Sequence, residues 1–144
     1  MKNPFMTWQI WAILSAIFAA LTAIFAKVGI EGINSDFATF IRTIVILLVL
    51  GIILFLTQQF QPLDSLSHKS LLFLVLSGLA TGGSWICYFR ALKIGNASQV
   101  APIDKLSVVL VAIFGVIFLG EQLTFNHWIG IGLIASGAII IALQ

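Results

Sequence analysis

Ionisable side chains inside apolar runs are the residues of this sequence that could do chemistry. Asp104 and Lys105 stand side by side about two turns into one such run, and Arg42 lies near the start of another. A charged side chain at the centre of a membrane-spanning helix costs about 2.5 to 3.5 kcal/mol, so such residues are functional candidates. They could bind an anionic or zwitterionic solute, or exchange a proton. In the structural alternative, Asp104 only neutralises a buried cation and fixes helix packing.

Further candidates lie in or at the ends of the same apolar runs. Asp104 is the only acid that we place within a span, and Arg42 and Lys27 are its expected ion partners. Because adjacent helical residues point about 100° apart, Asp104 and Lys105 are not expected to face each other. Trp85 is placed deep enough to line a cavity. The candidates for binding a substrate or a proton are Asp104, Lys105, Arg42, Lys27, Trp85, Tyr88 and Arg90.

Pro102 precedes the Asp104-Lys105 pair and has two interpretations. A proline in the first turn of a helix is harmless, because its missing N–H has no partner there. Further in, it kinks the helix and frees a carbonyl toward a cavity, as in the broken helices of many transporters. The sequence leaves both interpretations open.

Catalytic and metal-binding patterns are missing from the sequence. It has no Ser-His-Asp or Cys-His grouping, no cluster of metal ligands and no phosphate-binding loop. The single Cys87 has the character of a small apolar filler. We therefore expect no enzyme activity, no cofactor and no metal site.

Composition shows which environment positions these residues. Of the 144 residues, 60% are hydrophobic and only 8% are charged. Such a composition is typical of a membrane protein. The net charge of +2 is small and its basic residues are scattered, which argues against nucleic-acid binding.

Apolar runs of the length needed to cross a bilayer recur along the chain. A hydrocarbon core of about 30 Å requires roughly 20 helical residues. Five runs approach this length, at about 8–28, 37–57, 70–92, 98–119 and 127–143. Helix is expected because every backbone group must be paired inside hydrocarbon. The sequence predicts an all-α bundle of five transmembrane helices, forming one domain over residues 1–144, with short linkers that make successive helices antiparallel.

Charge placement bears on the orientation of this bundle. The first apolar run is too long for a signal peptide and is expected to stay as a helix. Two basic residues fall on the membrane side of the N-terminus and five on the other. The positive-inside rule then favours a cytoplasmic C-terminus. So weak a bias is also compatible with insertion in both orientations.

The sequence around Pro102 resembles the EamA family of the drug/metabolite transporter superfamily. The resemblance spans nearly the whole chain and is carried by Phe25-Ala26-Lys27-Val28-Gly29, Ala97-Ser98-Gln99-Val100-Ala101-Pro102, Leu106-Ser107 and Leu119-Gly120-Glu121-Gln122-Leu123-Thr124. Most members of that family have ten helices, built as two repeats of five in opposite orientation. This chain looks like a single repeat of five helices.

The resemblance implies a function and a partner. It implies a secondary transporter that exports a small metabolite or drug-like solute. It also implies a multi-pass protein of the plasma membrane of a bacterium or archaeon. A single repeat is expected to work as a dimer. Its partner is either a second copy of the same chain, for which an antiparallel arrangement is one option, or a paralogous five-helix chain. The alternative is a non-transporting membrane subunit that associates with a larger complex.

Overall fold

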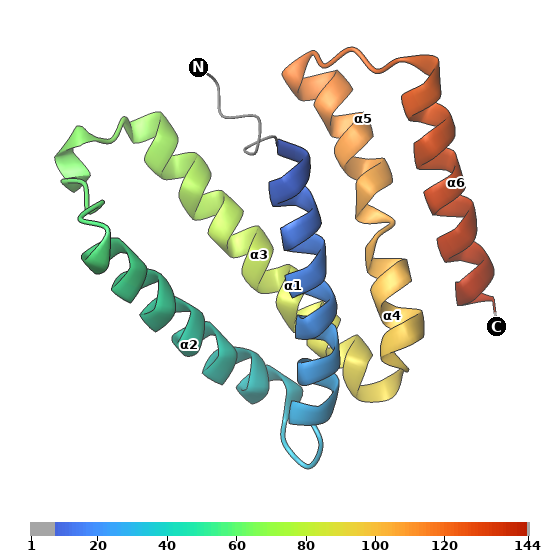
Figure 1. The fold of residues 1–144 in the computed structure, drawn as a ribbon, viewed down its shortest axis with the longest axis horizontal. Coiled ribbons are helices and arrows are strands. Elements are labelled where there is room, and N and C mark those ends of the chain that lie inside the picture. The colour runs from blue at the N-terminus through green and yellow to red at the C-terminus, as the bar shows by residue number, and fades with distance from the viewer. Residues whose placement is uncertain (1–7, 144) are drawn as a thin grey trace. The chain divides into compact units, whose positions relative to one another are not determined.

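The structure, a computed structural model, describes residues 8–143, and within them the regular elements are helices without a strand. Figure 1 shows their order along the chain. The helices are α1 (Trp8–Gly29), α2 (Ser35–Leu56), the short 3₁₀ helix η1 (Leu63–Ser65), α3 (His68–Ile94), α4 (Ala97–Asp104), α5 (Ser107–Leu119) and α6 (Phe125–Ala142). The predicted all-α class is confirmed.

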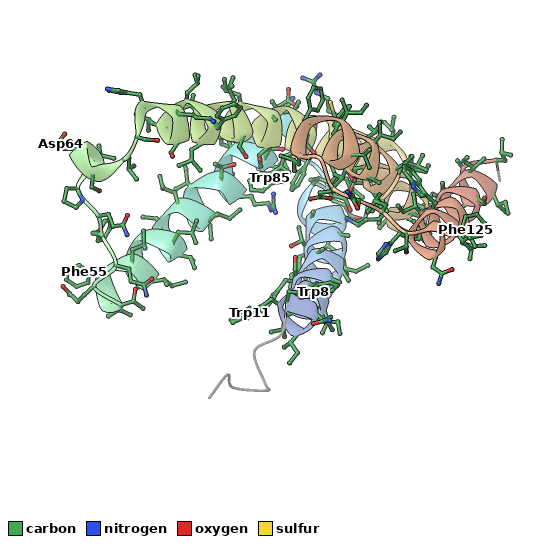
Figure 2. All side chains as sticks on the ribbon, turned by 90° about the horizontal axis from the view of Figure 1, so that it is seen from above. Trp8, Trp11, Phe55, Asp64, Trp85 and Phe125 are labelled. Atoms are coloured by element: carbon green, nitrogen blue, oxygen red, sulfur yellow. The ribbon has the colours of Figure 1, made fainter. Side chains whose placement is uncertain are left out.

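Five stretches of the described chain are long and apolar enough to cross a membrane, as the sequence predicts. They are α1, α2, α3, α6 and the stretch Ala97–Leu119, which combines α4 with α5. Large apolar side chains project outward along them, among them Trp8 and Phe125, which are 76% and 79% exposed (Figure 2). A water-soluble protein would bury many of these side chains. Lipid, by contrast, is their natural solvent.

The chain divides into two compact units. One unit contains residues 26–93, that is, the end of α1, α2, η1 and α3. The other contains the rest of α1 and residues from 94 onward, in which α6 packs against both α4 and α5.

The fourth span, predicted as one run over about 98–119 with a kink at Pro102 as one of two interpretations, is interrupted. Helix α4 ends at Asp104 and α5 begins at Ser107. Around the break the backbone hydrogen bonds span three residues instead of four. Leu106 N–H donates to the Ile103 carbonyl over 3.0 Å. The N–H groups of Val108 and Val109 likewise donate to the carbonyls three residues earlier, each over 3.0 Å. The tighter 3₁₀ geometry ends one helix and begins the next.

Pro102 is the sixth residue of α4 and so lies beyond its first turn. A proline removes a hydrogen bond to the residue four positions earlier and crowds the preceding turn. The break lies on the following turn, at Lys105 and Leu106. The first-turn interpretation is therefore wrong, and the proline's own steric effect does not coincide with the interruption.

The Leu-Gly-Glu sequence at the end of α5 has a clear structural role. Gly120 has a φ of 68°, in the left-handed region that glycine adopts without strain. The Glu121 N–H then donates to the Gly115 carbonyl over 3.1 Å and closes the helix end. The Glu121 side chain turns back over Gly115, where a Cβ would lie 2.7 Å from its Oε2 atom.

Candidate functional site

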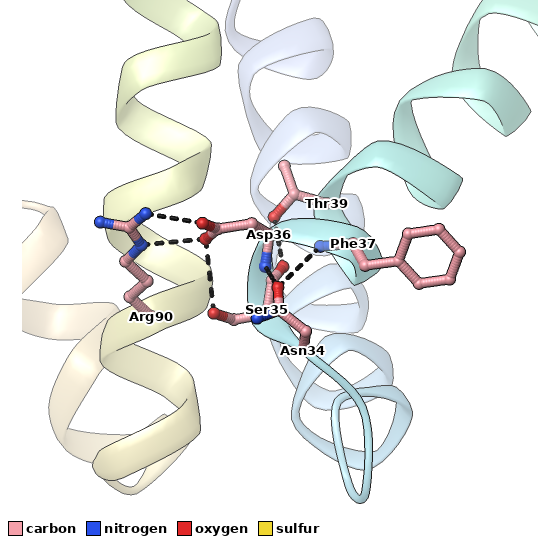
Figure 3. Close-up of polar contacts among 6 residues, drawn as sticks. All are labelled: Asn34, Ser35, Asp36, Phe37, Thr39 and Arg90. Carbon is pink, nitrogen blue, oxygen red and sulfur yellow. Dashed lines mark hydrogen bonds and ion pairs between the residues drawn. The ribbon is translucent and has the colours of Figure 1, made fainter.

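The start of α2 is fixed by a side-chain cap. Asn34 precedes the helix, and its Oδ1 accepts hydrogen bonds from the backbone N–H groups of Asp36 and Phe37 at 2.9 and 3.1 Å (Figure 3). Asp36 therefore lies in the first turn of the helix, where a negative charge interacts favourably with the helix dipole. The carboxylate has a defined position before any tertiary contact is made.

Asp36 forms a two-point ion pair with Arg90 of α3. Arg90 Nε donates to Oδ1 over 2.9 Å and Arg90 Nη2 donates to Oδ2 over 2.6 Å (Figure 3). The sequence analysis began this span at about residue 37 and treated Asp104 as the only acid within a span, which is wrong, because α2 already begins at Ser35. The missed signal is the Asn-Ser-Asp cap itself, since an antiparallel neighbour brings the start of α2 beside the end of α3.

Arg42, one turn and a half further along α2, lies against aromatic rings of α3. Its guanidinium carbon is 4.1 Å from the centre of the Trp85 ring and 5.5 Å from that of Phe89. Both distances fall within the range of cation–π attraction. Tyr88 lies next to this cluster, with its ring edge-on to Phe89 at 6.5 Å. The structure thus brings together three of the predicted site residues, Arg42, Trp85 and Tyr88.

Two lysines bind backbone carbonyls at the same end of this unit. Lys27 Nζ donates to the Leu92 carbonyl in the last turn of α3 over 2.7 Å. Lys93 Nζ donates to the carbonyls of Ile30 and Ile33, each over 2.7 Å, in the turn that joins α1 to α2. Helix ends leave carbonyls unpaired, and a cation is a favourable partner for them. These lysines therefore fasten the ends of α1 and α3.

Asp104 and Lys105 lie in the other unit and contact each other. Lys105 Nζ is 3.2 Å from Asp104 Oδ2. The expectation that the two would not face each other is wrong: Lys105 keeps a helical φ of -70°, and its long side chain nevertheless reaches back to the carboxylate. The pair thus marks the interruption of the fourth span.

A groove of about 640 Å³ runs between α2 and α3. Apolar side chains form most of its walls. Two glycines, Gly78 and Gly82, leave α3 without side chains along it, and the polar residues on its walls are Asp36, Thr39, Thr43, Ser77, Thr81 and Trp85. From Asp36 to Leu50 the groove follows α2 over 15 residues, a rise of roughly 21 Å at 1.5 Å per step. It is large enough for a drug-sized molecule.

The threonines of the groove already use their hydroxyl hydrogens. Thr39 Oγ1 donates to the Ser35 carbonyl over 2.9 Å, and Thr43 Oγ1 donates to the Thr39 carbonyl over 2.8 Å. On α3, Thr81 Oγ1 donates to the Ser77 carbonyl over 2.9 Å. Each hydroxyl therefore satisfies its donor within its own helix and keeps its acceptor lone pairs.

Metal binding has no visible site in the described chain. Residues 8–143 contain no group of three or more His, Cys, Asp or Glu side chains placed to hold an ion. The chemistry that the groove and its surroundings can perform is the binding of a solute by charge, hydrogen bonds and apolar contact.

The sequence matches a known family over nearly its full length. The EamA-like transporter family matches residues 6–143. An uncharacterised transporter in the cobO 3' region of a Sinorhizobium species is 60% identical over 136 residues, which cover 94% of this chain and 96% of that protein. An uncharacterised protein of Methanocaldococcus jannaschii is 30% identical over the same shares of both chains.

More distant similarity extends to named transport subunits. The probable 4-amino-4-deoxy-L-arabinose-phosphoundecaprenol flippase subunit ArnE of Hamiltonella defensa is 27% identical over 78 residues, which cover 54% of this chain and 70% of that protein. No solved structure matches the chain significantly.

Proposed function

The chain belongs to the EamA-like transporter family, and from this premise we propose that it exports a small metabolite or drug-like solute as a secondary transporter. The chain is a multi-pass membrane transporter of the cell membrane, as its family and its five apolar spans show. We propose in addition its direction of transport, its class of solute, its binding site and its dimeric state.

The groove between α2 and α3 is the observation that carries this proposal. It lies on two membrane-spanning helices, and a polar residue, Asp36, lines one end of it. A largely apolar concavity with a few convergent polar groups is the usual form of a small-molecule site. A groove on one chain is open, so a second copy or a paralogous five-helix chain would complete the path.

The candidate residues named from the sequence have proposed roles in or around the groove. Trp85 forms part of the wall, and Arg42 holds its ring from one face. Arg90 fixes the Asp36 carboxylate, Lys27 binds the Leu92 carbonyl in the last turn of α3, and Tyr88 lies edge-on to Phe89 beside Arg42. In the other unit, the Asp104-Lys105 pair beside the interrupted helix is the proposed point of proton exchange or solute contact.

Two neighbouring glycines of α3 allow a test in which only the groove changes. Gly82 lines the groove and Gly83 does not, yet a Cβ added at either position meets no atom within 4 Å. Gly82→Leu should therefore fill the groove without a clash, while Gly83→Leu adds the same side chain about 100° around the helix. The two variants are matched in residue type, depth and helix propensity.

Proteoliposomes loaded with the small-molecule fraction of a cell extract provide the assay. Mass spectrometry of the external medium should detect solutes released by the parent protein and by Gly83→Leu but retained by Gly82→Leu. Equal release by the parent and Gly82→Leu, or release from protein-free liposomes that equals both, would sink the proposal.

A non-transporting subunit is the second candidate function. It is supported by the relatives of Hamiltonella defensa and Aeromonas salmonicida, both of which are named as flippase subunits. In that case the purified chain would release no solute alone. Co-expression with a stoichiometric membrane partner would restore release, and this outcome separates the two candidates.

A further inference from the structure

The charge on the groove walls has one sign. Among the described residues that line it, Asp36 is the only charged one; Arg42 and Arg90 lie beside the groove but are not part of its lining. A solute that binds there meets a carboxylate that Arg90 already pairs, and the lining itself contributes no cation. The acceptor positions that remain on the carboxylate still favour a positively charged head that can donate to them.

The hydrogen-bonding capacity of the walls has the same bias. Because the hydroxyls of Thr39, Thr43 and Thr81 donate to carbonyls of their own helices, they offer a solute acceptor lone pairs. Apart from the Ser77 hydroxyl and the Trp85 indole, the polar side chains of the groove therefore act as acceptors. An acceptor-lined site rewards a solute that brings N–H donors and leaves an acceptor-only solute unpaired.

The Asp36 carboxylate has capacity left beyond its ion pair. Two carboxylate oxygens offer about four lone-pair positions. The two bonds from Arg90 use one on each oxygen, and the Ser35 hydroxyl donates to Oδ1 over 3.5 Å, which leaves a position on Oδ2. The two-point contact also fixes the orientation of the carboxylate. Arg90 is therefore a positioning residue for the Asp36 site.

The apolar walls determine the rest of the solute. From Asp36 the groove continues for roughly 21 Å along α2, past Ile46, Leu47 and Leu50 on one side and Leu74 on the other. We infer that this groove takes an amphipathic amine, with a protonated amino head on Asp36 and an apolar body along α2 and α3. The inference rests on the proposed transport function and names its substrate class.

Four probes of nearly equal shape separate the charge and donor requirements. The first probe is 4-phenylbutylamine, which has a positive charge and N–H donors. Its trimethylammonium analogue has the charge without donors, 4-phenylbutanol has a donor without charge, and 5-phenylpentanoate has the opposite charge. Binding to the full chain in nanodiscs, corrected for protein-free nanodiscs, is measured by isothermal titration calorimetry. The amine should bind about tenfold more tightly than each of the other three, as expected when a charge-assisted hydrogen bond is lost.

Variants locate the binding to the groove. Asp36→Asn and Thr43→Val should each weaken binding of the amine, and Gly82→Leu should abolish it. Gly83→Leu should leave it unchanged, because Gly83 does not line the groove. Arg90→Gln should reduce the ratio of amine to trimethylammonium affinity while the Tm stays near that of the parent, which a purely structural role would not produce. Gel filtration of each variant checks its folding, and Thr43→Val retains the test if Asp36→Asn does not fold.

Several outcomes would overturn the inference. Equal affinity for the amine and the alcohol would mean that the groove only accommodates apolar chains, such as those of membrane lipids. Tighter binding of the carboxylate would reverse the assigned charge. Release of anionic solutes through the groove, blocked by Gly82→Leu, would keep the transport proposal and remove the amine. If the amine binds in the groove but no solute is released, the transport proposal is removed and the binding of the amine is kept.

Discussion

The contact between Arg42 and Trp85 should contribute measurably to the stability of the unit that contains α2 and α3. Arg42 is seven residues from the start of α2, roughly 10 Å along a helix that crosses a hydrocarbon core of about 30 Å. An arginine at such a depth costs up to about 2.5 to 3.5 kcal/mol to insert. The aromatic face of Trp85, 4.1 Å from the guanidinium carbon, offsets part of that cost.

The size of this offset follows from the geometry. Cation–π contacts contribute about 0.5–1 kcal/mol when exposed and about 2 kcal/mol or more when desolvated. Arg42 is half-buried, which places the contact between these limits, at about 1 to 2 kcal/mol. Phe89 is 5.5 Å away, near the outer limit for such contacts, and contributes less. Trp85→Leu should therefore shift the ratio of folded to unfolded protein roughly 5- to 30-fold more in the parent than in an Arg42→Met background.

A double-mutant cycle measures this difference. The free energy of unfolding of the parent, Trp85→Leu, Arg42→Met and the double variant is determined by steric trapping, which does not depend on tryptophan fluorescence. Trp8→Leu with Arg42→Met serves as the control cycle, because Trp8 is 76% exposed near the chain's start and is not one of the rings over which Arg42 lies. Additivity of Trp85→Leu and Arg42→Met within about 0.3 to 0.5 kcal/mol would refute the assignment.

Three further outcomes are expected. Lys93→Met removes the cation from two carbonyls of the turn between α1 and α2. It should lower the free energy of unfolding by about 1 to 2 kcal/mol, measured by mixed-micelle denaturation. Lys105→Met is the control, because its ion-pair partner is its neighbour in sequence, and an equal loss in both variants would contradict the expectation. Pro102→Ala should leave amide hydrogen exchange at Leu106 fast, because proline acts on the preceding turn, and slower exchange there would show that the proline causes the break. Asp104→Asn should strongly reduce proteoliposome release; unchanged release would remove this residue from the site.

The membrane spans were predictable because their signal is a sum over many residues. The thickness of the bilayer sets a minimum length of apolar helix, so errors at single positions cancel. The five predicted spans are all present in the described chain. The family was equally accessible, since the Leu119-Gly120-Glu121 sequence serves a specific helix end with a left-handed glycine.

The site was only partly predictable because it depends on single residues at helix ends. Asp36 fell just outside the predicted span of about 37–57, since Asn34 and Ser35 favour turns as strongly as they favour the start of a helix. The Asp104–Lys105 contact was excluded by a rule about the directions of neighbouring side chains, which takes no account of the reach of a lysine. Trp85 and Arg42 were both chosen as candidates, but sequence gives no distance between residues 43 positions apart.

The lysines that fasten α1 to α3 connect membrane insertion with the finished fold. Lys27 and Lys93 belong to the basic residues whose placement biases orientation during insertion, and the same two ammonium groups later bind carbonyls at 2.7 Å. We therefore expect their charge to act twice, first on the chain during insertion and then on the folded unit. An attempt to invert the protein by neutralising them would also loosen the helix ends. An orientation switch is better engineered by adding basic residues near Lys69, at the opposite end of α3, where the fold leaves these contacts intact.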